Sequence, residues 1–326
     1  MRASRPLRLL ARHAATESDW VRTRRAGADV AVFHELLPPP GGGGHQFIRA
    51  LIRELERRGL TVELNRISGG TSACLFNSFN FDFHRLRRFA RERCRMVHRV
   101  DGPIGVYRGF DDGTDRRIVE INHTLADATV LQSCFSLEQH LELGIELRNP
   151  VVIPNAVDAR IFFPAAAREP LSGRKIRLIA TSWSDNPNKG AEIFAWLDRN
   201  LDWRRYEMTF VGRSQLTFEH ILAIEPVASE EVASLLRGHD VYVAASRHDP
   251  CSNALLEALA CGLPAVYLRS GGHPQLVGEA GLPFDRAEEL PEVLGRLAEE
   301  LDERRRLISL PSLEEVADRY LAVLGG

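Results

Sequence analysis

Short apolar runs alternate with segments of helical periodicity along most of the chain. In the first unit, residues 28–36 predict a buried strand, and residues 47–55 place apolar side chains at helical spacing. Gly59 ends this helix, and residues 61–64 begin another strand. A strand, a Gly-rich loop, a helix and a strand in this order are typical of a parallel sheet.

The alternation continues to the end of the chain and divides it into two similar halves. Linker composition begins near residue 164, and the last helix, 312–324, has one apolar side. We therefore predict an α/β protein with domains at 29–163 and 164–308, followed by a terminal segment at 309–326. Further strands are predicted at 73–76, 94–100, 127–133, 176–180, 208–211, 241–245 and 265–268.

One strand-helix-strand unit carries the most informative polar residues. Asp249 and Pro250 follow its first strand and predict an N-cap and the first helical position. Gly262 is placed to end the helix. Its loops lie at the carboxyl ends of strands, where open α/β sheets bind ligands.

Asp249 and Glu257 are too far apart to act as a contacting acid pair. Seven residues separate them, which corresponds to about 12 Å along a helix axis. They could hold the two ends of one elongated ligand, with the N–H groups of the first helical turn facing an anion between them. The alternative is a capping aspartate and an exposed helix glutamate.

This pattern resembles the Glu-x7-Glu motif of retaining GT-B glycosyltransferases of family 4. The resemblance implies two Rossmann-like domains facing an interdomain cleft, with the terminal helix packing back on the first domain. It also implies that Glu257 binds the ribose of a nucleotide sugar and that Asp249 faces the transferred sugar. Ser252 and Asn253, in the first turn, would face the donor.

The diphosphate motif of the family is matched only in part. Lys189 stands where the family has its lysine, whereas Trp183 stands where an arginine is usual. Gly212 and Arg213 resemble the family's "VG.G" turn, so Arg213 is a candidate replacement cation. Lys189 is then expected to contact the diphosphate.

Other segments extend the resemblance. Pro226 and Val227 precede a helix where relatives hold the nucleotide base through backbone groups. The segment 153–158 resembles the family's "IPNGVD" connection, with Ala156 in place of glycine. Gln275 replaces a glutamate in the loop that resembles "GG.PE".

Two features of the first domain are candidate site residues. Gly43 and Gly44 belong to a Gly-rich loop before a helix, where a ligand could approach the backbone closely. The alternative is a flexible turn. Asp101 follows a strand, whereas His98 lies inside it, so Asp101 is the candidate for acceptor orientation or base assistance; a turn-capping role is its alternative.

Composition excludes several other classes of protein. The 326 residues are 44% hydrophobic with a net charge of −2, which fits two globular domains rather than a nucleic-acid-binding protein. Five scattered cysteines and the histidine spacing predict no disulfide framework and no metal site. No run is long enough to span a membrane.

Residues 1–28 form an Arg-rich extension without the apolar core of a secretory signal. They are expected to be a tail, with contact to an anionic membrane surface or a transit segment as alternatives. The cytoplasm is the expected location, with peripheral attachment at the inner membrane face as a variant of it.

The resemblance implies a hexosyltransferase-type enzyme that needs no metal or other cofactor. Its donor would be a UDP- or GDP-linked sugar, and its acceptor an unidentified glycan, lipid-linked or small molecule. The alternatives are a nucleotide-sugar epimerase, a sugar phosphorylase, or a non-catalytic nucleotide-sugar-binding protein.

Overall fold

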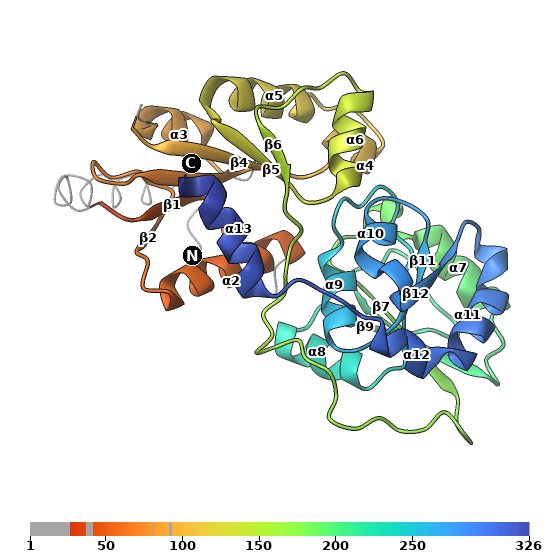
Figure 1. Cartoon of the computed structure of the whole chain (residues 1–326). Helices are drawn as coiled ribbons and strands as arrows, with labels where there is room; N and C mark the ends of the chain where they lie inside the picture. The colour runs from red at the N-terminus through yellow and green to blue at the C-terminus, as the bar shows by residue number, and fades with distance from the viewer. Residues whose placement is uncertain (1–26, 37–41, 80, 91–92, 326) are drawn as a thin grey trace, which may run out of the picture.

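The computed structural model of the chain describes residues 27–36, 42–79, 81–90 and 93–325. The extension expected at 1–28 therefore lies almost wholly outside the described residues. The chain forms two domains, each with a six-stranded parallel sheet flanked by helices (Figure 1). This confirms the predicted α/β fold with a parallel sheet in each domain.

The first sheet has the strand order β2-β1-β3-β4-β5-β6. Its elements are β1 (Val30–Phe33), α2 (Gly43–Arg57), β2 (Val62–Leu64), β3 (Ala73–Asn77), α3 (Phe83–Phe89), β4 (Arg95–Val100), α4 (Ile104–Arg108), α5 (Thr114–Leu125), β5 (Ala128–Leu131), α6 (Cys134–Glu142) and β6 (Pro150–Val152).

The second sheet has the order β12-β11-β10-β7-β8-β9. Its strands are β7 (Ile176–Ser182), β8 (Tyr206–Gly212), β9 (Leu222–Ile224), β10 (Val241–Ala244), β11 (Ala265–Leu268) and β12 (Gly281–Phe284). Its helices are η1 (Pro187–Lys189), α7 (Ala191–Asn200), α8 (Ser229–Arg237), α9 (Asn253–Ala260), α10 (His273–Val277), η2 (Gly278–Ala280), η3 (Ala287–Glu289), α11 (Leu290–Glu299) and α12 (Leu301–Arg306), and the chain ends with α13 (Leu313–Gly325).

Strands such as β1, β10 and β11 read as unbroken apolar runs because both faces of each sheet are covered by helices. In β1, Val30 and Val32 pack into one core with α2 and α13, while Ala31 and Phe33 pack into the core on the opposite face. A parallel sheet that is buried on both sides has no polar face to alternate with. The apolar runs are therefore a consequence of the layered fold.

Helix α13 returns from the second domain and packs on the first, beside α2 (Figure 1). The ring of Tyr320 lies 5.9 Å from that of Phe47, and both side chains are buried. Arg58 pairs with Asp318 and donates to the backbone oxygen of Glu314 at 2.7 Å. The chain thus crosses between the domains twice, after β6 and after α12.

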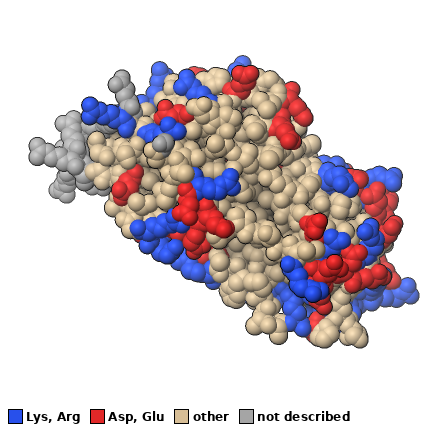
Figure 2. Space-filling model, in the orientation of Figure 1, with Lys and Arg blue, Asp and Glu red and all other residues tan. Residues whose placement is uncertain are grey.

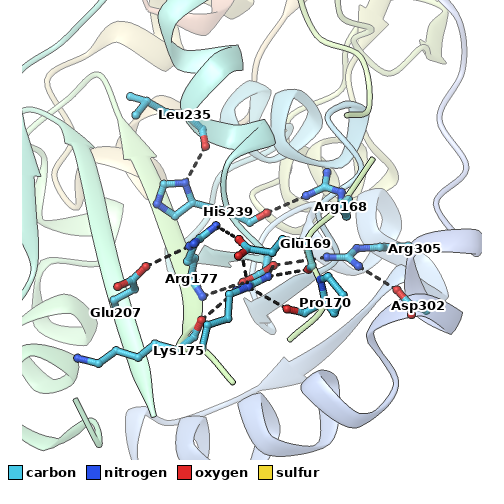
Figure 3. Close-up of polar contacts among 12 residues, drawn as sticks. Arg168, Glu169, Pro170, Lys175, Arg177, Glu207, Leu235, His239, Asp302 and Arg305 are labelled. Atoms are coloured by element: carbon cyan, nitrogen blue, oxygen red, sulfur yellow. Dashed lines mark hydrogen bonds and ion pairs between the residues drawn. The ribbon is translucent and has the colours of Figure 1, made fainter. Parts of the chain in front are cut away.

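The linker after the first crossing is fixed to the amino ends of the second sheet's strands by buried charges. Arg174 donates to both carboxylate oxygens of Asp240, at 2.6 and 2.8 Å. Figure 3 shows neighbouring contacts in this region, including that of Arg168 with the backbone oxygen of His239. Burial favours the neutral form of Asp240, but Arg174 and the backbone N–H of Arg177 hold its pKa below the ordinary value. The carboxyl ends of these strands are left facing the other domain.

Charged side chains of both signs are spread over the two domains on the face shown in Figure 2, and the band between the domains is mostly uncharged. This distribution agrees with the small net charge of the chain. The face shown in this view has no large basic surface of the kind that nucleic-acid-binding proteins use.

Candidate functional site

A cavity of about 330 Å³ lies between the two domains. The first domain lines it with Asp101 and Tyr107, and the second with Lys189, Asp249 and Asn253. These residues lie in loops and short helices that follow the carboxyl ends of strands. The predicted cleft between two facing sheets is therefore confirmed.

Lys189 and Asp249 form an ion pair in the wall of this cavity. The Lys189 ammonium donates to Asp249 Oδ2 at 2.7 Å and lies 5.3 Å from the centroid of the Tyr107 ring. Burial alone would lower the pKa of Lys189, but Asp249 and Tyr107 raise it above its ordinary value. Burial would likewise raise the pKa of Asp249, but Lys189 holds it below its ordinary value. Both groups are therefore charged at neutral pH.

Helix α9 begins at Asn253, so the predicted start at Asp249–Pro250 is wrong. Ser252 is the N-cap residue, and the Asp249 carboxylate points to Lys189 instead. The ion pair binds the carboxylate more strongly than a capping contact would. Glu257 consequently lies about one turn inside the helix rather than two.

The first turn of α9 presents unsatisfied donors to the cavity. The backbone N–H groups of Asn253 and Ala254 have no acceptor in the part of the chain that the structure describes. Ser252, Asn253 and Ala254 all line the cavity. This end of α9 is suited to an anion.

A smaller pocket of about 90 Å³ adjoins the main cavity, and Ser182 and Trp183 line both. A Cβ atom on Gly212, whose φ is +138°, would lie 1.8 Å from the backbone oxygen of Ser182, so only glycine fits there. Five of the predicted donor-binding residues line this pocket: Gly43, Gly212, Pro226, Val227 and Glu257.

Glu257 is the only ionisable side chain among the described residues that line the smaller pocket. Its carboxylate has no hydrogen-bond or ion-pair partner among the described residues, and burial raises its pKa to about 8. It is half-buried, so the alternative of an exposed helix glutamate is wrong. A desolvated carboxyl group without a partner destabilises the fold and is typical of a ligand site.

Gly43 and Gly44 are the first two residues of α2 rather than part of a loop. A Cβ atom on Gly43 would lie 2.4 Å from that of Asn253, because α2 and α9 meet at this point. A Cβ atom on Gly44 would have no heavy atom within 4 Å. Both glycines line the main cavity, but only Gly43 is required by packing.

Asp101 is held in the cavity wall by three side chains. Oδ2 accepts from the Ser78 hydroxyl at 3.1 Å, and Oδ1 accepts from Arg99 at 3.3 Å and from the Gln132 amide. His98 is fully buried inside β4. These contacts orient the Asp101 carboxylate without filling all of its lone pairs.

Arg213 does not reach either cavity. Its guanidinium stacks on Trp183, with Cζ 4.2 Å from the ring centroid, and its side chain is exposed. Trp183 itself lines both cavities. In this structure Arg213 can therefore act on the cavities only through the tryptophan.

The domains touch through specific polar contacts around the cavity. The side-chain oxygen of Gln275, in the loop that resembles "GG.PE", accepts from the backbone N–H of Cys134 in the first domain at 2.9 Å. Asn188, beside Lys189, donates to the backbone oxygen of Tyr107 at 2.6 Å. The cavity is consequently enclosed by both domains.

Sequence reasoning missed Tyr107, Gln132, Arg99 and Asn155. Tyr107 lies on the five-residue helix α4, which has too few residues for a periodic signal. Arg99 occupies a strand position that is normally apolar. Asn155 lies within the segment that resembles "IPNGVD", but the adjacent residues do not indicate its contacts with Arg99 and Asn253.

Within the described ranges, no group of three or more His, Cys, Asp or Glu side chains is arranged to hold a metal ion. None of the helices described there has both the length and the apolarity needed to cross a bilayer.

Comparison with known proteins finds a family match within the second domain. Residues 186–300 match the family model described as Glycosyl transferases group 1. The chain is 29% identical over 199 residues to the MMP alpha-(1->4)-mannosyltransferase of Mycolicibacterium hassiacum, which covers 53% of this chain and 47% of the relative. The chain spans about half the length of the curated relatives it matches.

Solved structures resemble almost the whole chain. The sucrose-phosphate synthase of Thermosynechococcus elongatus has a TM-score of 0.69 at 15% identity, covering 90% of this chain and 97% of that one. The Anabaena HepE protein in complex with UDP-glucose has a TM-score of 0.64 at 16% identity, covering 91% and 97%. These likenesses establish the GT-B fold with two Rossmann-like domains.

The raised pKa of Glu257 predicts a pH-dependent loss of stability. Between its ordinary value of 4.5 and about 8, the folded protein keeps a proton that the unfolded chain has released, so stability falls as pH rises. Glu257→Gln should flatten the fall of Tm over this range, as measured by thermal unfolding at several pH values. Glu231→Gln, on the exposed side of α8, is the control. An unchanged slope in Glu257→Gln would contradict this account of Glu257.

Proposed function

We propose that this protein is a glycosyltransferase that moves a sugar from a nucleotide-diphosphate donor to an acceptor with retention of configuration. The observation that carries the proposal is the pairing of two adjoining pockets at the interdomain cleft. The smaller contains the unpartnered Glu257, and the larger contains Lys189 beside the first turn of α9. The nucleoside of the donor would occupy the smaller pocket, and its diphosphate and sugar would occupy the larger one.

Glu257 is assigned to the ribose. With its pKa raised to about 8, Glu257 is mainly protonated in the free protein at neutral pH, and two neighbouring ribose hydroxyls that donate to it would favour its ionised form. Pro226 and Val227 line the same pocket and are assigned to the base through backbone groups. A UDP- or GDP-linked sugar fits this assignment, and the UDP-glucose bound to the structural relative supports a UDP-linked donor.

The diphosphate is assigned to Lys189 and the free N–H groups of α9. As the bond between the anomeric carbon and the phosphate oxygen breaks, its electron pair leaves with the diphosphate. Lys189 and the amides of Asn253 and Ala254 would stabilise the charge that develops there. No metal is needed in this scheme.

Asp249 and Asp101 are assigned to the reacting sugars. Asp249 would orient hydroxyls of the transferred sugar and stabilise positive charge at its anomeric carbon. Asp101, held by Ser78, Arg99 and Gln132, would orient the acceptor hydroxyl and assist its deprotonation. The new bond joins the acceptor oxygen to the anomeric carbon on the face that the diphosphate leaves.

The alternatives are a nucleotide-sugar epimerase, a sugar phosphorylase or a non-catalytic binding protein. The relatives named as a mannosyltransferase and a sucrose-phosphate synthase favour transfer. The departures at Trp183, Asp249 and Gln275 are what keep a binding protein as the second candidate. Acceptor and cellular location stay predictions.

A panel of nucleotide sugars separates a glycosyltransferase from a non-catalytic binding protein. The wild-type protein should slowly hydrolyse one donor without an acceptor, and should do so equally with EDTA present, because the proposed charge stabilisation comes from protein groups. Released nucleotide and sugar would be measured by chromatography. Binding without hydrolysis would support the binding protein, and loss with EDTA that Mg²⁺ or Mn²⁺ restores would contradict metal independence.

Three substitutions separate the proposed roles. Glu257→Ala should mainly raise the donor KM, because a charge-assisted hydrogen bond of ~1.5–3 kcal/mol to an unreacting ribose is lost. Asp249→Asn should lower kcat more than nucleotide affinity, and Lys189→Ala should lower both. Steady-state kinetics and nucleoside diphosphate binding would be measured for each.

The control for Lys189→Ala is the double variant Lys189→Ala/Asp249→Asn. The single variant leaves a buried carboxylate without its cation, which by itself repels a diphosphate. The double variant removes this repulsion, so its nucleoside diphosphate affinity, compared with that of Asp249→Asn, reports the loss of the cation. Full turnover in Asp249→Asn would show that Asp249 has no role at the transferred sugar.

A further inference from the structure

Arg99 is a buried cation with an unusual set of partners. Its side chain is 1% exposed in β4, and its guanidinium lies 5.1 Å from the centroid of the Phe47 ring. Nη1 donates to Asn77 Oδ1 at 2.7 Å and to Asp101 Oδ1 at 3.3 Å. Nη2 donates to Asn155 Oδ1 at 2.9 Å. Burying such a group is costly, so its contacts require an explanation.

The contact with Asn155 fixes the orientation of an amide. A guanidinium can only donate, so the atom of Asn155 that faces Arg99 must be the oxygen. Asn155 is fully buried in the connection between the domains, and its Nδ2 donates to Oδ1 of Asn253 at 3.0 Å. The direction of each hydrogen bond follows from the one before it.

The side-chain amide of Asn253, which accepts from Asn155, lies in the cavity wall. Because Asn253 Oδ1 accepts from Asn155, its Nδ2 is left as a donor, and it has no protein partner among the residues the structure describes. Without Arg99 the two amides could rotate together and present an oxygen instead. Arg99 therefore determines whether the ligand meets a donor or an acceptor.

We propose that Arg99 and Asn155 are positioning residues that hold Asn253 Nδ2 as a donor to a phosphate oxygen of the bound nucleotide. This inference rests on the proposed function. The same guanidinium also donates to Asp101. One buried cation therefore orients the Asp101 carboxylate in the first domain and the Asn253 amide in the second, and both line the cavity. The alternative is that Asn155 only braces the two domains.

Asn155→Asp distinguishes these roles. The new carboxylate still accepts from Arg99, so the variant should fold with an unchanged or higher Tm. It cannot donate, so Asn253 should rotate its Nδ2 towards residue 155 and turn Oδ1 to the cavity. Nucleoside diphosphate should then bind about 10- to 100-fold more weakly, as expected for a lost hydrogen bond to a charged group.

A double-mutant cycle removes the effect of the added negative charge. Affinities for UDP and GDP would be measured by calorimetry for wild type, Asn155→Asp, Asn253→Ala and the double variant. Charge repulsion acts in both backgrounds, whereas rotation of the amide requires Asn253. The substitution at 155 should therefore weaken binding much less when Asn253 is already alanine.

Equal weakening in both backgrounds, unchanged affinity in Asn155→Asp, or failure of Asn155→Asp to fold would each overturn the inference. If the wild-type protein binds neither nucleotide, the proposed function fails, and the inference fails with it. If the wild type binds and the cycle shows no coupling, only the inference fails.

Discussion

The buried ion pair between Lys189 and Asp249 is the interaction on which the cleft depends. Each charge would be unstable there alone, because desolvation favours its neutral form, and each is kept ionised by the other. Tyr107 of the first domain lies against the lysine, so the pair is enclosed only when both domains contribute. The pair therefore places a cation in the cavity wall while adding no net charge of its own, and an incoming diphosphate must share Lys189 with Asp249.

The two domains contact each other where α2 meets the start of α9, and the same turn of α9 lines the cavity. Gly43 allows this contact, because any side chain there would collide with Asn253. Asn253 also receives the hydrogen bond from Asn155, so the start of α9 is held by the first domain and by the connection between the domains. The two chain crossings and the packing of α13 keep these parts together.

Local sequence patterns predicted most of the strands and helices, whereas they predicted only some of the contacts that form the site. Strands such as β10 and β11 are short apolar runs because helices bury both of their faces, and Gly262, at φ +79°, ends α9 as predicted. The start of α9 was misplaced because Asp249 has a stronger partner 60 residues away. The Arg99–Asn155–Asn253 contacts span 56 and 98 positions, so only the folded chain reveals them. Arg213 was a reasonable candidate cation, but stacking on Trp183 keeps it outside the cavities.

The most direct test of this account is a crystal structure of the protein with a bound nucleoside diphosphate. We expect the ribose hydroxyls at Glu257 and the diphosphate between Lys189 and the first turn of α9. A nucleotide bound outside the cleft, or one with its ribose at Asp101 and its phosphates away from α9, would contradict the account.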